Sequence, residues 1–196
     1  MTIKVIPTKI INVGTGLVPV QRQTDGHGCH PYKNKTVYRL NNQLPHRKTT
    51  RLKDFDYSLP HAYFITLCTK DKVEYFKDNG FYREIIGCLI HEKEKYGFSI
   101  YAYCLMPDHL HILLSPKELG RSIPDFIGAF KSKTTRTAWQ RGIRGSLWQS
   151  SFYDHILRKD ENVKQAAEYI FNNPVRKGMV SQWQEYPYLG MLDEIP

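Results

Sequence analysis

Hydrophobic and polar positions follow two different periods from residue 62 onward. Segments rich in β-branched and aromatic residues predict buried strands, whereas apolar residues that recur every three or four positions predict helices. Residues 147–158 fit either a strand or a turn followed by a strand. The other expected strands cover residues 62–69, 98–106 and 109–115, and the expected helices cover residues 80–97, 122–142 and 160–174.

Residues at the helix ends support these boundaries. Ser122 is expected to cap the second helix, with Pro124 in its first turn, and Gly97 is expected to close the first helix. The third helix opens with acidic residues, which suit the positive end of the helix dipole. It is expected to stop at Pro174, because the residue before a proline avoids the helical region.

The order of these elements is β-α-β-β-α-(β)-α, with no internal repeat. This order predicts an α+β fold, a ferredoxin-like (split βαβ) antiparallel sheet with helices packed on it. The folded domain is expected to span residues 56–190, followed by a C-terminal tail at 191–196. Residues 1–55 are dominated by turn and breaker residues, so we expect a poorly ordered N-terminal extension there.

The charge of the chain points to a polyanionic partner. Its 196 residues suffice for one domain with a real core, and 28 Lys and Arg against 19 Asp and Glu leave a formal charge of +9. Such a field attracts polyanions, above all nucleic acid. No segment reaches the roughly 18 consecutive apolar residues of a membrane span, so no membrane partner is expected.

The four cysteines lie far apart and form no CxxC pair, so neither a zinc ribbon nor a thiol redox motif is indicated. Three of them lie in apolar segments, where reduced core thiols are expected, and this favours the reducing cytoplasm. His27, Cys29 and His30 form a further cluster of metal-ligand types. Without a second ligand pair, that cluster is a weak signal for a metal.

Two histidines stand two positions apart in the segment MPDHLHILLSP, residues 106–116. In a strand, His109 and His111 point to one face of the sheet, while Leu110 and Ile112 point to the other. A pair of imidazoles on one face can bind a metal ion, although packing or a mutual hydrogen bond is the more common role of such a pair.

Tyr169 and Asn173 are four positions apart in the last expected helix, so they share a helical face. If this face lies against the histidine strand, two imidazoles and one amide oxygen hold a divalent metal, with a phenol beside them. Magnesium prefers oxygen ligands, so this mixed set suits manganese at least as well. The metal would polarise and orient a phosphodiester. The alternative role of Tyr169 is core packing.

At these residues the sequence resembles the REP-associated tyrosine transposases. These enzymes are relatives of the small transposases of bacterial insertion sequences that move single-stranded DNA, and they belong to the HUH endonucleases with a single catalytic tyrosine. The resemblance covers roughly residues 50–190. Its four blocks are RLKDFDYSLPHAYFITLCT (51–69), YAYCLMPDHLHILL (101–114), LWQSSFYDHIL (147–157) and EYIFNNPVRKGMV (168–180).

The resemblance implies Mg²⁺ or Mn²⁺ bound by His109, His111 and Asn173, with Tyr169 as the nucleophile. It implies single-stranded or hairpin DNA as substrate, a 5′-phosphotyrosine and a free 3′-hydroxyl as products, and a monomer or homodimer as the active form. Asp108 departs from the family, which usually has asparagine in this turn. The long N-terminal extension is not a family feature.

Other side chains are candidates for contact with DNA. Trp139 and Trp148 can stack on unpaired bases or pack in the core. Tyr153 is a rival nucleophile, but no ligand-type residue stands one turn away from it. The residues expected to contact DNA are Arg51, Lys131, Lys133, Arg136, Trp148, Arg176 and Lys177.

Two other functions compete with a transposase. The first is a binding protein of the same fold that recognises hairpin DNA without cutting it, although the full set of site residues argues against this loss. The second is an RNA phosphoesterase that uses two histidines as acid and base. This acid–base chemistry would require a second strand in which a histidine stands two positions from a serine, a threonine or another histidine. The remaining histidines supply no such pair.

Overall fold

The computed structural model describes residues 61–77, 79–157 and 162–196. The expected N-terminal extension, with Arg51 and the cluster of His27, Cys29 and His30, lies outside the described residues. The strands are β1 (Tyr63–Cys68), β2 (Phe98–Met106), β3 (His109–Pro116), β4 (Tyr153–Ile156) and β5 (Leu189–Gly190). The helices are α1 (Asn79–Tyr96), α2 (Ile123–Gln140), α3 (Val163–Phe171) and α4 (Asn173–Arg176), with 3₁₀ turns at Lys70–Lys72, Tyr75–Lys77 and Trp183–Glu185.

The five strands form one sheet in the order β4-β1-β3-β2-β5, and every neighbouring pair is antiparallel. The first four strands, with α1 and α2 as the connections, have the split βαβ arrangement expected from the sequence. The α+β prediction is therefore confirmed. Strand β5 was not predicted, because a strand of two residues is too short to show a period.

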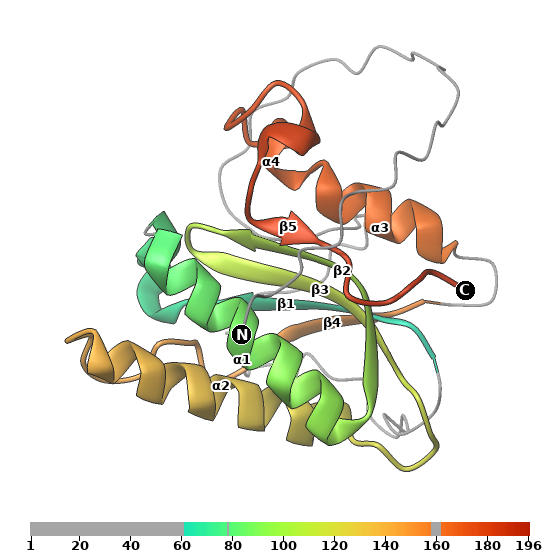
Figure 1. Cartoon of the computed structure of the whole chain (residues 1–196), viewed down its shortest axis with the longest axis horizontal. Coiled ribbons are helices and arrows are strands. Elements are labelled where there is room, and N and C mark those ends of the chain that lie inside the picture. Colours follow the sequence, from blue (N-terminus) through green and yellow to red (C-terminus); the bar gives the residue numbers. More distant parts are fainter. Residues whose placement is uncertain (1–60, 78, 158–161) are drawn as a thin grey trace, which may run out of the picture. The chain divides into compact units, whose positions relative to one another are not determined.

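The two faces of the sheet are covered by different helices, with α1 and α2 on one face and α3 on the other (Figure 1). The central strand β3 supplies both cores in alternation. Leu110 and Ile112 belong to the core with α1 and α2, whereas Leu113 packs with Ala167 and Ile170 of α3. The predicted alternation along β3 is thus confirmed, and the histidines lie on the α3 face.

The capping signals of the first two helices are confirmed. The hydroxyl of Ser122 accepts a hydrogen bond from the backbone N–H of Asp125 at 3.3 Å, and Pro124 lies in the first turn of α2. Gly97 follows α1 with a φ of +69°, a conformation that a side chain would disfavour. Both helices therefore begin and end close to the predicted residues.

The last helix differs from its prediction. It ends at Phe171, and Asn173 begins the separate short helix α4, with Pro174 in its first turn. Proline has no N–H to continue the hydrogen bonds of α3, but its fixed φ suits the first turn of a new helix. Helix α3 starts at Val163, and Asn162 is its cap. The acidic residues that were expected to open this helix lie outside the described part of the chain.

Residues 147–158 form a turn followed by a strand, the second of the two predicted possibilities. Trp148 forms an isolated β-bridge with Thr69, and β4 begins only at Tyr153. The indole of Trp148 is 1% exposed, packs on Phe76, and donates a 2.7 Å hydrogen bond from Nε1 to Thr134 Oγ1. This residue therefore belongs to the core on the α2 side.

The described cysteines Cys68, Cys88 and Cys104 are buried, as predicted. Near the C-terminus, the backbone N–H groups of Leu192 and Asp193 donate to the carbonyl of Ile100 in β2. Within the described part of the chain, no helix is both long enough and apolar enough to span a membrane.

We expect Trp148→Ala to lower the free energy of unfolding by about 3–5 kcal/mol, the usual cost of deleting a buried large aromatic side chain. Urea denaturation followed by circular dichroism measures the change. Trp139→Ala is the matched control, since that indole is 46% exposed and its loss should cost much less. Equal costs for the two substitutions would contradict the core position of Trp148.

Candidate active site

The turn between β2 and β3 positions the two histidines. The strands pair Met106 with His109, so only Pro107 and Asp108 separate them. Thr69 holds this turn, because its backbone N–H donates to the carbonyl of Asp108 at 2.9 Å and its hydroxyl donates to the same oxygen at 3.0 Å. The start of β3 is thereby attached to the end of β1.

Both imidazoles are oriented through Nδ1. Thr66 Oγ1 in β1 lies 2.8 Å from Nδ1 of His111, and the carboxylate of Asp108 is hydrogen-bonded to Nδ1 of His109. The rings stand edge to face with centroids 4.7 Å apart, and each histidine is only 3% exposed. When Nδ1 carries the proton and donates, Nε2 keeps its lone pair, so both Nε2 atoms are the metal-binding candidates.

The protonation of this pair suits a ligand role. Burial lowers the pKa of His111 well below its ordinary value, and its neighbours His109, Arg176 and Lys177 lower it further. His111 is therefore neutral at pH 7, as a metal ligand must be. The hydrogen bond from His109 lowers the pKa of Asp108, and this effect outweighs the opposing effect of burial, so Asp108 is a carboxylate.

Tyr169 of α3 and His111 of β3 share one neighbour, Phe64. The ring of Phe64 in β1 has its centroid 5.4 Å from that of His111 and 5.8 Å from that of Tyr169. Tyr169 is half-buried, and the guanidinium carbon of Arg176 in α4 lies 4.3 Å from the centroid of its ring. A cation thus accompanies the candidate nucleophile.

Asn173 starts α4 and is buried, at 6% exposure. Its side-chain Nδ2 donates to the backbone carbonyl of Tyr169 at 3.3 Å, which fixes the amide relative to the end of α3. None of the described residues donates to its Oδ1, so this oxygen is the atom left for a ligand. Arg176 at the end of α4 and the following Lys177 lower the pKa of His111, so these two cations lie near the histidine pair.

These residues fit a divalent metal with an incomplete protein ligand set. Two buried imidazoles, each with Nδ1 engaged and no described donor on Nε2, match how metal-binding histidines are held. The described part of the chain has no group of three or more His, Cys, Asp or Glu that could hold a metal. Among the described residues, a third protein ligand would therefore be a group of another kind, such as the Asn173 amide oxygen. The remaining positions would be open to phosphate oxygens.

The rival tyrosine, Tyr153, lies on the same face of the sheet. In β-pairing it stands opposite Thr66, which stands opposite His111, so the three residues form one row across β4, β1 and β3. Since neighbouring strands are about 4.8 Å apart, two strand spacings separate the backbones of Tyr153 and His111. Tyr169 instead lies on the helix that covers this face, where it packs on Phe64, a neighbour of His111.

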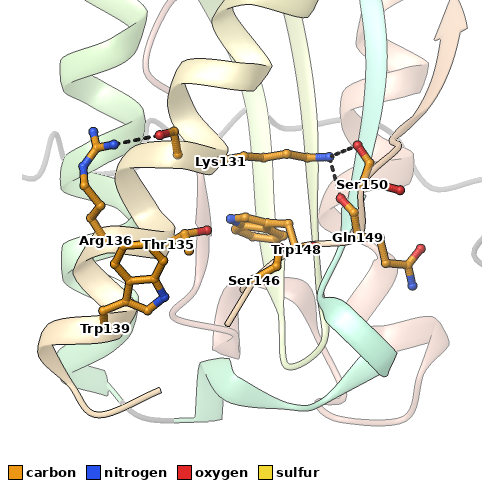
Figure 2. A pocket seen from close by; sticks show the side chains of 9 residues that line it. Lys131, Thr135, Arg136, Trp139, Ser146, Trp148, Gln149 and Ser150 are labelled. Atoms are coloured by element: carbon orange, nitrogen blue, oxygen red, sulfur yellow. Dashed lines mark hydrogen bonds between the residues drawn. The ribbon is translucent and has the colours of Figure 1, made fainter. Parts of the chain in front are cut away.

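Several residues expected to contact DNA have structural partners within the protein. Trp148 is in the core, so it is not available for base stacking. Lys133 forms a 3.1 Å ion pair with the buried Glu92. The ammonium group of Lys131 donates to the backbone carbonyls of residues 149–151, and Figure 2 shows it reaching from α2 toward Gln149 and Ser150.

The other expected DNA contacts remain exposed to solvent. Arg136 is exposed on α2, and Arg176 and Lys177 are exposed beside the histidine pair. Thr66 and Phe64 were not predicted as site residues. The sequence signal for them is weak, since both are ordinary members of a buried strand. Only the antiparallel register of β1 and β3 shows that Thr66 faces His111.

Comparisons with known proteins find a matching family and two similar sequences. Residues 57–173, more than half of the chain, match the family model described as Transposase IS200 like. A Haemophilus influenzae protein provisionally named a REP-associated tyrosine transposase is 26% identical over 143 residues, which cover 68% of this chain and 81% of the relative. The REP-associated tyrosine transposase of Escherichia coli K12 is 25% identical over 107 residues, which cover 55% of this chain and 62% of the relative.

One solved structure is also similar. It is a REP-associated tyrosine transposase bound to a REP hairpin, which matches with a TM-score of 0.60 and 21% identity over 71% of this chain and 82% of that chain. This similarity shows that the two proteins share a fold.

We expect the protein to bind Mn²⁺ at one site, and Thr66→Val to weaken that binding by about 10–100-fold, the usual cost of removing the group that orients a ligating histidine. Isothermal titration calorimetry measures the affinity, and Thr137→Val on α2 is the control of equal chemistry. His111→Ala should abolish binding in a protein that circular dichroism reports as folded. Unchanged affinity in folded Thr66→Val would contradict the orientation argument.

Proposed function

The chain belongs to the IS200-like transposase family, and we propose that it cleaves and rejoins single-stranded or hairpin DNA with a divalent metal. Tyr169 is the nucleophile, and the reaction passes through a 5′-phosphotyrosine. One observation carries the proposal: two buried imidazoles, each held through Nδ1, lie on the face of the sheet that α3 covers, and Tyr169 of α3 packs on this face. The named relatives are transposases, which supports the same reaction.

The protein contributes position and charge to this reaction. His109, His111 and Asn173 would hold Mg²⁺ or Mn²⁺, which supplies Lewis-acid polarisation of the phosphodiester when bound. Thr66 and Asp108 keep the imidazoles in the orientation that exposes Nε2. Phe64 fixes the spacing between His111 and the phenol by packing against both rings.

The covalent step exchanges one phosphate ester for another. Tyr169 gives up its phenolic proton to solvent, and the phenolic oxygen forms a bond to the phosphorus. The bond between the phosphorus and the 3′-oxygen breaks, and that oxygen leaves with a proton as a free 3′-hydroxyl. Because the phosphotyrosine ester preserves the bond energy, a 3′-hydroxyl can reverse the step and rejoin the strand without ATP.

Arg176 and Lys177 would stabilise the negative charge of the substrate. Both are exposed cations close to His111, and Arg176 also lies over the ring of Tyr169. A phosphate that reaches the phenol therefore meets a guanidinium, which can bind two phosphate oxygens. The formal charge of +9 would attract the DNA over a longer range.

A catalytically silent DNA-binding protein is the second candidate function. This function is consistent with the fold and the basic charge, but it does not explain why the two imidazoles are oriented through Nδ1. An RNA phosphoesterase with acid and base histidines is less well supported, because both rings are buried and stand next to one another. A chelator separates the two enzyme candidates, since EDTA should abolish only the metal-dependent reaction.

We expect Tyr169→Phe to abolish the covalent protein–DNA adduct while leaving stability nearly unchanged, because only one half-buried hydroxyl is lost. The measurement is denaturing gel electrophoresis after incubation with labelled hairpin DNA and Mn²⁺. Tyr153→Phe is the matched control on the same face of the sheet and should still form the adduct. An adduct that persists in Tyr169→Phe, or a DNA-modified peptide containing Tyr153, would overturn the assignment.

The protein should bind a hairpin with a single-stranded flank more tightly than a perfect duplex of the same length. The affinity should also fall steeply with salt, because phosphate contacts release counterions from DNA. Fluorescence anisotropy at several salt concentrations measures both effects. Equal affinity for the duplex and the flanked hairpin would contradict the proposal that the substrate is single-stranded or hairpin DNA.

A further inference from the structure

A groove lies between helix α2 and the segment that leads into β4, on the opposite face of the sheet from the histidine pair. Its volume is about 320 Å³, which is at the small end of ligand sites in proteins. Of the nine residues that line it, none is acidic and two are cationic, while most of the others carry hydroxyl or amide groups. Because the lining has no negative charge, it does not repel a phosphate group, and its polar side chains can donate hydrogen bonds to one.

The groove contains an exposed aromatic surface. Trp139 is 46% exposed, although most large aromatic side chains of the described residues are buried. Its Nε1 donates a 2.7 Å hydrogen bond to the carbonyl of Gly145, so the ring is held in one orientation. Figure 2 shows its ring at the edge of the groove, with Trp148 forming the inner wall. An oriented, exposed indole is a stacking surface for a base.

A cation stands one helical turn from this indole. Arg136 is exposed, and its Nη1 donates to Ser132 Oγ at 2.7 Å, which directs the guanidinium along α2. A guanidinium has five N–H donors, so this contact leaves capacity for a phosphate. Lys131 closes the other side of the groove by binding the carbonyls of Gln149, Ser150 and Ser151.

The groove is attached to the end of the sheet that carries the active site. Gln149 donates from its backbone N–H to the carbonyl of Cys68 at 2.9 Å, and Cys68 is paired with His109. Trp148 pairs with Thr69, which binds the carbonyl of Asp108. A DNA strand with one phosphate at the histidine pair could therefore continue around this end of the sheet to the groove.

We propose that this groove binds an unpaired nucleotide of the DNA strand, with its base on Trp139 and its phosphate at Arg136. The inference rests on the proposed function, since it requires a single-stranded segment in the substrate. Stacking explains why a large indole stays exposed beside a cation. The groove would add affinity for single strands of any sequence, because every base has an aromatic face.

The test measures binding of the full chain to a labelled oligothymidylate strand by fluorescence anisotropy. Trp139→Ala should weaken binding by about tenfold, the scale of one base–aromatic stack, whereas Trp139→Phe should keep most of the affinity. Both variants lose the hydrogen bond to Gly145, so their difference isolates the ring. Equal affinity of the two variants would overturn the proposal.

Arg136→Gln should lower the slope of log affinity against log salt by about one, the effect of one phosphate contact. Arg83→Gln on the exposed side of α1 is the matched control and should change the slope much less. An identical change in both variants would mean that Arg136 acts only through net charge, which contradicts the proposal.

A further control separates this inference from the proposed function. A blunt hairpin without unpaired nucleotides should bind to Trp139→Ala and to the unchanged protein with equal affinity. Weaker binding of this hairpin to Trp139→Ala would overturn the proposal that Trp139 contacts only unpaired nucleotides. If the unchanged protein binds no oligothymidylate and forms no covalent adduct, the proposed function itself fails. If the unchanged protein binds and forms the adduct while Trp139→Ala binds equally well, only the groove assignment fails.

Discussion

The position of β3 at the centre of the sheet is the constraint on which the site depends. This strand is paired with β1 on one side and β2 on the other, and its alternate side chains fill two different cores. A shift of one residue would bury both imidazoles under α1 and α2 and turn Leu110 and Ile112 toward α3. The packing that stabilises the fold therefore also fixes which face the histidines occupy.

The same pairing supplies the groups that orient the imidazoles. Thr66 reaches His111 only because β1 and β3 are antiparallel in this register, and Asp108 reaches His109 from a turn that Thr69 holds. The geometry of the candidate site thus follows from the pairing of the strands in the sheet. The other two candidate residues, Tyr169 and Asn173, belong to the short helices α3 and α4, and Phe64 packs on the rings of both Tyr169 and His111.

Strands β1 to β3, the caps of α1 and α2, and the shared face of His109 and His111 were predictable, because these features depend on local period and on residues near each other in sequence. The break between α3 and α4 was missed, since a proline can either end a helix or begin the next one. The partners of Trp148 and Lys133, Thr134 and Glu92, could not be read from the sequence, because they are set by packing between elements. Composition alone does not distinguish a buried tryptophan from an exposed one.

The central claim is that Nε2 of both histidines holds the metal beside Tyr169. The most direct measurement is a crystal structure of the full chain with Mn²⁺ and a flanked hairpin, in which anomalous scattering locates the metal. We expect one Mn²⁺ bonded to Nε2 of His109 and of His111, with the Asn173 amide oxygen as the third protein ligand. A metal bonded through Nδ1, or one located away from this histidine pair, would contradict the account.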